Sequence, residues 1–127
     1  YVISKVADAL NEEGKAIKGS NILILGLAYK ANVDDCRESP SFVLMKKLEA
    51  KGAIVEYNDS FVPVVPPTRE HAHFSGKQSV DIEDVYDLIL VSTDHAEYKT
   101  FDFSGYSCPL VDSRNCISKK PQKYYHA

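Results

Sequence analysis

The sequence predicts a doubly wound α/β fold with a mostly parallel sheet, and three observations support this prediction. Residues 21–25 and 87–92 are short, nearly unbroken apolar runs, which is the pattern of strands buried on both faces of a parallel sheet. Between them, residues 39–51 carry apolar side chains at helical spacing and end at Gly52. Residues 53–57 then complete a strand–loop–helix–strand unit, which favours parallel pairing of its two strands.

The individual elements can be justified in chain order. Residues 2–18 place apolar side chains three or four positions apart and predict a helix that ends near Gly14 or Gly19. The second helix begins at Ser39 and Pro40, because serine is a good N-cap and proline suits the first helical position. The later expected elements are a short helix at 81–85, a strand at 87–92, a helical turn at 94–98, a strand at 110–112 and a polar, frayed tail from 118 to 127. Together these elements indicate a Rossmann-like sheet.

Length and element order suggest one domain with two appendages. The chain has 127 residues, which is enough for a single compact domain. We expect residues 1–18 to be the end of a connecting helix, residues 19–118 to form the α/β domain, and residues 119–127 to be a polar tail. The sequence begins at Tyr1 without a methionine, which favours a fragment or a processed product.

Composition excludes several classes of partner. The formal net charge is −3 and no dense run of lysine and arginine occurs, so neither nucleic acid nor a membrane is an expected partner. The three cysteines are an odd number without CxxC spacing, which indicates a reducing, cytoplasmic environment and not a disulfide framework. No apolar run is long enough to cross a bilayer, and no signal peptide is evident.

Ligands of open α/β sheets collect at the carboxyl ends of the strands, and the loop after the first strand carries suitable side chains there. That loop has one glycine, Gly26, and not the three of a dinucleotide fingerprint. It offers the cations Lys30 and Arg37 and the ring of Tyr29, which suit phosphates and a base or ribose. Arg114, after the last expected strand, adds a planar guanidinium for bidentate phosphate contact.

This loop also carries a family resemblance. The run Gly-Leu-Ala-Tyr-Lys-Ala-Asn-Val-Asp-Asp-Cys-Arg-Glu-Ser-Pro, residues 26–40, strongly resembles the start of the C-terminal, UDP-binding domain of the UDP-glucose/GDP-mannose dehydrogenase family. Its second half looks most like the UDP-N-acetylglucosamine and UDP-N-acetylmannosamine 6-dehydrogenases. The resemblance extends from the leading helix to the Val-Asp-Ser-Arg-Asn run at 111–115, which is nearly the whole chain.

The resemblance implies an activity for the full-length protein. Family members oxidise the C6 hydroxyl of a UDP-sugar to a carboxylate, in two hydride transfers to NAD, through a catalytic cysteine that lies before this domain. Tyr29, Lys30 and Arg114 match substrate-binding positions, and Arg37 matches an arginine that reaches toward the NAD cofactor. The implied partners are the UDP-sugar, the protein's own N-terminal and central domains, and a second copy in a homodimer or higher homo-oligomer built on the leading helix. No residue here matches the catalytic cysteine, so we expect this chain alone to bind without oxidising.

Plainer interpretations of the same residues stay open. Arg37 could pair with the acidic residues beside it, Arg114 could pair with Asp112, and Tyr29 could pack against the strand end. Asp59 resembles the ribose-binding acid of dinucleotide folds, but without the glycine fingerprint it is interpreted as a turn or cap residue.

Other candidate groups are weaker. Cys36 lies in a polar loop without a nearby histidine, and Cys108 and Cys116 are expected to be filler residues. His71 and His73 alternate as on one strand face but have no third metal ligand. Two rival functions are a phosphoacceptor receiver domain and a stand-alone nucleotide-binding or regulatory module; of the two, a receiver would not bind UDP.

Overall fold

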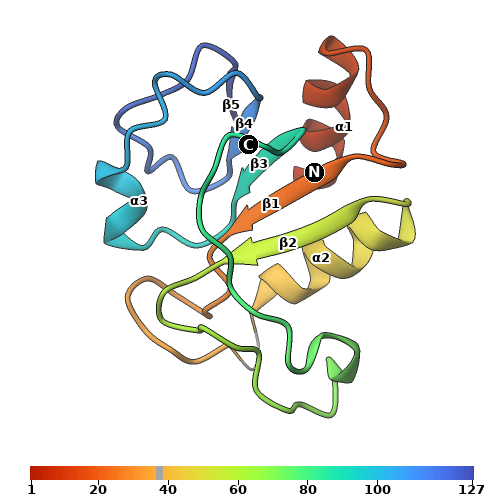
Figure 1. Ribbon diagram of the computed structural model, residues 1–127, viewed down its shortest axis with the longest axis vertical. Helices are drawn as coiled ribbons and strands as arrows, with labels where there is room; N and C mark the ends of the chain where they lie inside the picture. The colour runs from red at the N-terminus through yellow and green to blue at the C-terminus, as the bar shows by residue number, and fades with distance from the viewer. Residues whose placement is uncertain (37–38) are drawn as a thin grey trace.

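A computed structural model describes residues 1–36 and 39–127. Its helices and strands are, in chain order, α1 (Val2–Glu12), β1 (Asn21–Leu25), α2 (Pro40–Ala50), β2 (Ile54–Asn58), the 3-10 helix η1 (Ala72–Phe74), β3 (Leu88–Val91), α3 (Ala96–Thr100), β4 (Leu110–Asp112) and β5 (Tyr124–His126). The five strands form one sheet in the order β2-β1-β3-β4-β5, and each neighbouring pair is parallel (Figure 1). The predicted α/β fold is confirmed, with a wholly parallel sheet.

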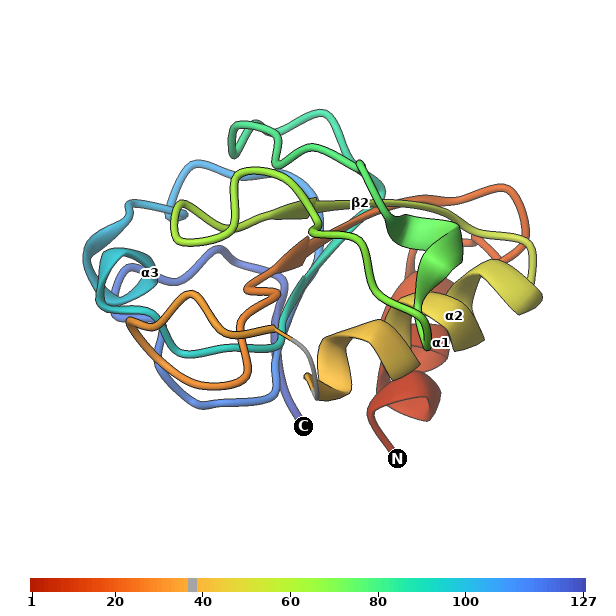
Figure 2. The same ribbon diagram turned by 90° about the horizontal axis from the view of Figure 1, so that it is seen from below.

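The two faces of the sheet are covered by different elements. Along β1, Ile22 and Ile24 join the core under α1 and α2, whereas Leu23 and Leu25 join a second core that contains Tyr98 of α3. Figures 1 and 2 show α1 and α2 together on one side of the sheet and α3 on the other. Burial on both faces explains why β1 is a continuous apolar run, because neither set of alternating side chains meets water.

Local signals place α2 as the sequence predicts. Ser39 is the N-cap, where its side-chain oxygen accepts a hydrogen bond from the N–H of Ser41, and Pro40 occupies the first helical position. The helix buries Phe42, Met45 and Leu48 against the sheet. Gly52 follows with a φ of +94°, a conformation that favours glycine at a helix end.

The leading helix is shorter than the expected range and belongs to the core. The helix α1 ends at Glu12, two residues before Gly14, which has a φ of +70°. Val6, Ala9 and Leu10 are fully buried within the core that α2 also covers. This burial makes α1 part of the packed structure of the domain.

Three expectations from the sequence are wrong. Residues 81–85 form no helix. The N–H of Val80 donates to the carbonyl of Tyr57, and the carboxylate of Asp84 accepts a hydrogen bond from the N–H of Ser107, so this irregular segment is bonded to distant parts of the chain and not to itself. The tail does not fray, because residues 124–126 add β5 to the edge of the sheet. The stretch around His71 and His73 is η1 and not a strand.

The helices are all short. Within the described part of the chain, no helix has the length and apolar character needed to cross a membrane.

Candidate functional site

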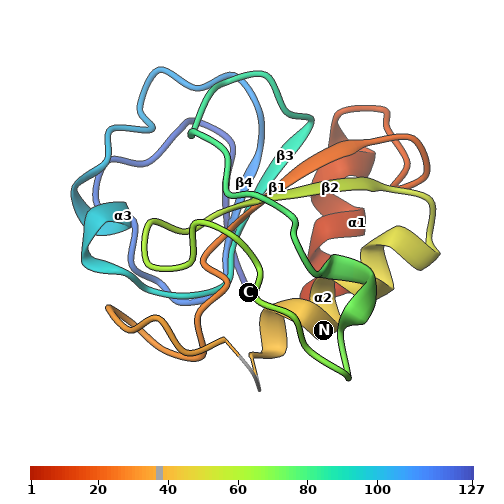
Figure 3. The same ribbon diagram turned by 60° about the horizontal axis from the view of Figure 1, so that its bottom comes forward.

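The carboxyl edge of the sheet gathers the loops that follow β1, β2, β3 and β4. Figure 3 shows the loop after β1 lying below α3, at the edge to which the strands point. Hydrogen bonds described below tie residues 26–32 to Asp59 after β2 and to the segment 92–96 after β3. The edge is therefore a connected surface and not a set of independent loops.

Gly26 sets the direction in which the first loop leaves β1. Its φ is +95°, and a Cβ added there would lie 2.3 Å from Cβ and 2.8 Å from the backbone nitrogen of Thr93. Its carbonyl oxygen accepts a hydrogen bond of 2.8 Å from the hydroxyl of Ser41. Because real Cβ atoms essentially never come within 3.0 Å of such neighbours, only glycine lets the loop pass this close to Thr93.

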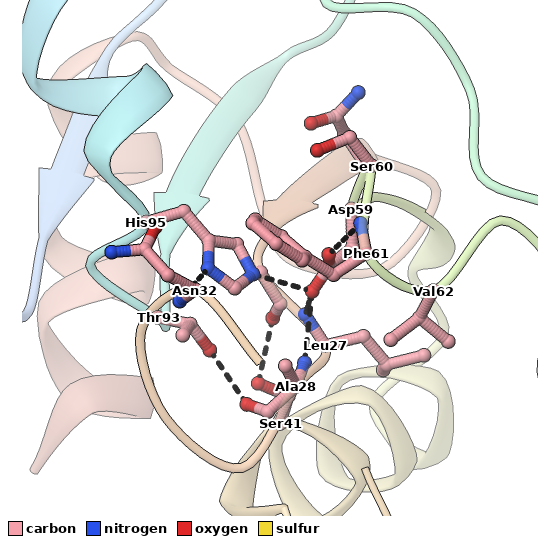
Figure 4. A network of polar contacts seen from close by, with 12 residues as sticks. Leu27, Ala28, Asn32, Ser41, Asp59, Ser60, Phe61, Val62, Thr93 and His95 are labelled. Carbon is pink, nitrogen blue, oxygen red and sulfur yellow. Dashed lines mark hydrogen bonds and ion pairs between the residues drawn. The ribbon is translucent and has the colours of Figure 1, made fainter. Parts of the chain in front are cut away.

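Asp59 holds the start of that loop. This carboxylate is fully buried, and its Oδ2 accepts hydrogen bonds from the N–H groups of Leu27 at 2.8 Å and Ala28 at 2.9 Å (Figure 4). Its Oδ1 accepts another from the N–H of Phe61 at 2.8 Å. Burial by itself would raise the pKa of Asp59, but the hydrogen bonds from His95 and from these loop amides outweigh it and lower the pKa. Asp59 is thus an ionised anchor.

His95 connects Asp59 to Asn32, further along the same loop. Its Nδ1 lies 2.8 Å from the backbone nitrogen of Asn32, and its Nε2 lies 2.8 Å from Oδ2 of Asp59. A backbone N–H can only donate, so Nδ1 accepts and Nε2 carries the proton that is donated to the carboxylate. The side-chain oxygen of Asn32 in turn accepts a hydrogen bond of 3.0 Å from the N–H of Ala96. Asn32 has a φ of +59°, in the left-handed region that asparagine tolerates better than most residues.

The predicted substrate residues of the first loop point to solvent. Tyr29 is 52% exposed and Lys30 is exposed, between the two anchored ends of the loop. The alternative in which Tyr29 only packs against the end of the strand does not fit this exposure. Arg37, the predicted cofactor-binding residue, lies outside the described residues.

Arg114 lies on the loop after β4, which Asp112 organises. The buried carboxylate of Asp112 accepts hydrogen bonds of 2.8 to 3.0 Å from the N–H groups of Arg114, Cys116 and Ile117 and from the hydroxyl of Tyr124. The guanidinium of Arg114 does not pair with this carboxylate. Its Nη2 lies 3.3 Å from Oδ1 of Asp94, and both side chains remain partly exposed.

The same segment after β3 thus reaches both sets of predicted residues. Asp94 pairs with Arg114, while His95, next to it, anchors the loop that carries Tyr29 and Lys30. The structure thus places Tyr29, Lys30 and Arg114 on two loops at one edge of the sheet, and both loops are bonded to the segment 94–95.

The cysteines and the remaining histidines offer no comparable site. Cys36 lies in the polar loop as predicted, is buried there, and borders a depression with Asp34, Asp35 and Pro66. Burial raises the pKa of the Cys108 thiol to about 12 and that of the Cys116 thiol to about 11, which disfavours the reactive thiolate. Among residues 1–36 and 39–127, no group of three or more His, Cys, Asp or Glu side chains is arranged to hold a metal ion.

The sequence interpretation missed the roles of Asp59 and His95. An aspartate directly after a strand of a parallel sheet is a signal for a ligand-edge anchor, and the interpretation as a turn residue captured only its bond to Phe61. No local pattern marks His95, because its two partners are 36 and 63 positions away.

The chain is similar in sequence to proteins of known class. The family model described as "UDP-glucose/GDP-mannose dehydrogenase family, UDP binding domain" matches residues 23–119, which include both candidate loops. The UDP-glucose 6-dehydrogenase YwqF of Bacillus subtilis is 33% identical over 125 residues, which cover 89% of this chain and 27% of that protein. The UDP-N-acetyl-D-mannosamine dehydrogenase of Methanocaldococcus jannaschii is 30% identical over 124 residues, which cover 97% of this chain and 24% of that protein. The chain thus spans about a quarter of the length of these relatives.

Two solved structures also match nearly the whole chain. The UDP-N-acetyl-mannosamine dehydrogenase Cap5O of Staphylococcus aureus matches 97% of this chain and 29% of its own, with a TM-score of 0.65 and 28% identity. A UDP-D-ManNAc dehydrogenase of Pyrococcus horikoshii matches 98% of this chain and 29% of its own, with a TM-score of 0.78 and 22% identity, which supports the fold.

Proposed function

This chain belongs to the UDP-glucose/GDP-mannose dehydrogenase family, and from that premise we propose that it is the nucleotide-sugar-binding part of an NAD-dependent UDP-sugar 6-dehydrogenase. The observation that carries the proposal is the loop after β1, whose two ends are hydrogen-bonded to buried side chains while Tyr29 and Lys30 stay exposed between them. A rigid loop with an exposed aromatic ring and an exposed cation, at the carboxyl edge of a parallel sheet, suits a nucleotide.

Each candidate residue has a distinct role in this proposal. Lys30 and Arg114 hold the diphosphate or ribose of the UDP-sugar, because ammonium and guanidinium groups are the usual partners of phosphate oxygens. Tyr29 flanks the nucleotide with its ring, and Arg37 helps to position NAD. The proposed substrate is a UDP-N-acetylhexosamine, because the second half of the run at residues 26–40 resembles the N-acetylhexosamine enzymes. The relatives include UDP-N-acetylmannosamine as well as UDP-glucose enzymes.

The ion pair of Arg114 is compatible with this role. Asp94 and Arg114 are both partly exposed, and an exposed pair of this kind is worth only about 0–1 kcal/mol. A diphosphate carries more negative charge than one carboxylate, and two oxygens of one phosphate group can accept a bidentate pair of hydrogen bonds from a guanidinium. We therefore expect the phosphates to replace Asp94 as the partner of Arg114.

The oxidation itself is assigned to other parts of the whole protein. In the proposed reaction the C6 hydroxyl of the sugar is oxidised to a carboxylate in two hydride transfers to NAD, and a cysteine outside this chain forms the covalent intermediate. Cys108 and Cys116 do not suit that role because their pKa values are raised to about 12 and 11. On this proposal the chain binds UDP without oxidising a UDP-sugar.

A comparison of UDP with uridine tests the proposal. Each ligand would be titrated into the wild-type chain and two variants, Lys30→Ala and Lys46→Ala, and two-dimensional NMR would measure the weak affinities. Lys46 is an exposed lysine on α2 and serves as the charge-matched control. Lys30→Ala should weaken UDP binding by about 1.5–3 kcal/mol, the usual contribution of a charge-assisted hydrogen bond. Uridine has the ribose without the phosphates, so its binding should stay nearly unchanged if Lys30 holds the diphosphate and should fall as well if Lys30 holds the ribose. The Lys46→Ala chain should bind both ligands like the wild type.

Two results would contradict the proposal. Absence of any UDP-dependent change in the wild-type spectrum would remove the nucleotide site altogether. Equal losses of UDP affinity in Lys30→Ala and Lys46→Ala would show that only the overall charge of the chain matters, and the assignment of Lys30 would fail.

A further inference from the structure

We infer that His95 is a positioning residue for nucleotide binding, which fixes Tyr29 and Lys30 without touching the ligand. This inference rests on the proposed function, because it assigns the rigidity of the UDP-binding loop to one buried side chain. His95 is fully buried, so it can act on a bound nucleotide only through the residues around it.

The hydrogen bonds bracket the two exposed residues. On one side, the N–H of Ala28 donates to Asp59, and the carbonyl of Ala28 accepts a hydrogen bond of 3.0 Å from the hydroxyl of Thr93. On the other side, the N–H of Asn32 donates to Nδ1 of His95. Only residues 29–31 lie between these anchors. His95 links the two anchors, because its Nε2 binds the same carboxylate oxygen of Asp59 that accepts the hydrogen bond from Ala28.

The imidazole is itself held in place. The ring of Phe61 packs against it with a centroid distance of 4.8 Å and an interplanar angle of 36°, and the ring of Tyr98 lies at 5.6 Å. Asp59 is anchored independently of His95, by the amides of the first loop and by Phe61. A fixed imidazole therefore presents its unprotonated Nδ1 at one place, and the backbone of Asn32 has to meet it there.

The loss of this one bond has a predictable effect on binding. Fixing the backbone of a residue has an entropic cost, so a loop that is ordered before the ligand arrives binds more tightly than one that has to be ordered by it. Without the His95–Asn32 bond, the bonds that remain, from the N–H of Ala96 to the side chain of Asn32 and from the N–H of Tyr29 to Asp35, hold residues 29–31 less tightly, and UDP has to order them further. We expect a loss of affinity of about threefold to tenfold, the equivalent of one hydrogen bond of ordinary net strength.

Two substitutions of His95 separate its two nitrogen atoms. The side-chain oxygen of asparagine lies at the position of Nδ1, so His95→Asn keeps an acceptor for Asn32 and loses the donor to Asp59. Glutamine is one carbon longer, so His95→Gln keeps a donor near the position of Nε2 and loses the acceptor for Asn32. The matched control is Tyr98→Phe. It removes the partly buried hydrogen bonds of 2.7 and 3.0 Å from the Tyr98 hydroxyl to the carbonyl and the side-chain oxygen of Asn58, and it keeps the ring that packs on His95.

The experiment combines three readouts on the 127-residue chain. Thermal unfolding measures stability, hydrogen exchange of the Asn32 amide measures the closure of the loop, and NMR titration measures UDP affinity. In the wild type, the nitrogen chemical shifts of the imidazole should also show the proton on Nε2. His95→Gln should speed exchange at Asn32 and weaken UDP binding by about threefold to tenfold, and His95→Asn should restore both towards the wild type. Tyr98→Phe should lower the melting temperature while leaving exchange at Asn32 and UDP affinity unchanged.

The outcomes are distinguishable. Equal losses of UDP affinity in His95→Gln and Tyr98→Phe would overturn the inference, because loss of stability alone would then explain the effect. Unchanged exchange at Asn32 in His95→Gln would overturn it as well. If the wild-type chain does not bind UDP, the proposed function is refuted, and the exchange rates alone decide whether His95 holds the loop.

Discussion

Replacing Gly26 with alanine is expected to destabilise the domain more than the same change at a glycine in open space. The structure gives two separate reasons. Gly26 has a φ of +95°, which L side chains rarely adopt, and a Cβ there would lie 2.3 Å from Cβ and 2.7 Å from Oγ1 of Thr93. Gly76 has a similar φ of +84° but no atom within 4 Å of its virtual Cβ, so Gly76→Ala experiences the backbone strain alone.

The magnitudes follow from these two terms. A left-handed backbone conformation costs an L residue roughly 1–2 kcal/mol, which is our expectation for Gly76→Ala. Forcing an extra methyl group into a packed site adds about 1–3 kcal/mol, so Gly26→Ala should lose about 2–5 kcal/mol. The upper part of this range is favoured because one of the atoms in the way is the backbone nitrogen of Thr93, at 2.8 Å, which cannot rotate aside as a side chain can.

Urea unfolding of the wild type and both variants, followed by circular dichroism, measures these free energies directly. The difference between Gly26→Ala and Gly76→Ala isolates the contact with Thr93. If the two variants lose the same unfolding free energy to within about 0.5 kcal/mol, the reasoning is refuted. A difference of that size is typical of surface substitutions, so the close approach to Thr93 would then have no measurable cost.

The remaining predictions concern Asp59 and the cysteines. Because the folded pKa of Asp59 is lowered from 3.8, its ionisation contributes stability that is present above about pH 5 and is lost as the pH falls through the folded value. The unfolding free energy of Asp59→Asn should therefore depend less on pH between about pH 5 and pH 2 than that of the wild type. Asp8→Asn, at an exposed position of α1, is the control, and parallel curves for wild type and Asp59→Asn would contradict the prediction. At pH 7.5 the Cys108 and Cys116 thiols, whose pKa values are raised to about 12 and about 11, should react slowly with iodoacetamide until urea unfolds the chain, as mass spectrometry can follow. Fast labelling of the folded chain would contradict the raised pKa values.

The elements that the sequence predicts correctly are those whose signals are local. The strand β1 is recognisable because both of its faces are buried, and α2 because Ser39 and Pro40 mark its first turn. The strand β5 is not recognisable in this way. It has three partly polar residues at the edge of the sheet, and its position depends on contacts such as the bond from the Tyr124 hydroxyl to Asp112, which no local pattern encodes.

The same distinction applies to the site. The family motif and the positions after predicted strands point to the exposed residues Tyr29, Lys30 and Arg114. Their binding roles are predictions. The residues that hold them in place are distant in the chain. Asp94, after β3, forms an ion pair with Arg114, after β4, and His95 accepts a hydrogen bond from Asn32, which lies 63 positions earlier. Charged and buried partners that lie far apart in the chain can be identified only once the register of the sheet is known.

The parallel sheet also has a consequence for how this chain reaches its fold. Each neighbouring pair of strands is parallel, so none of these pairs can form as a local hairpin. The central pair, β1 and β3, is joined at its start by the bond from the N–H of Asn21 to Asp87, residues 66 positions apart in the chain. Such a high contact order makes the search for the first stable nucleus slow. We therefore expect this domain to fold more slowly than a hairpin-rich protein of equal length, with α2 and its flanking strands β1 and β2, the nearest neighbours in the chain, as its nucleus.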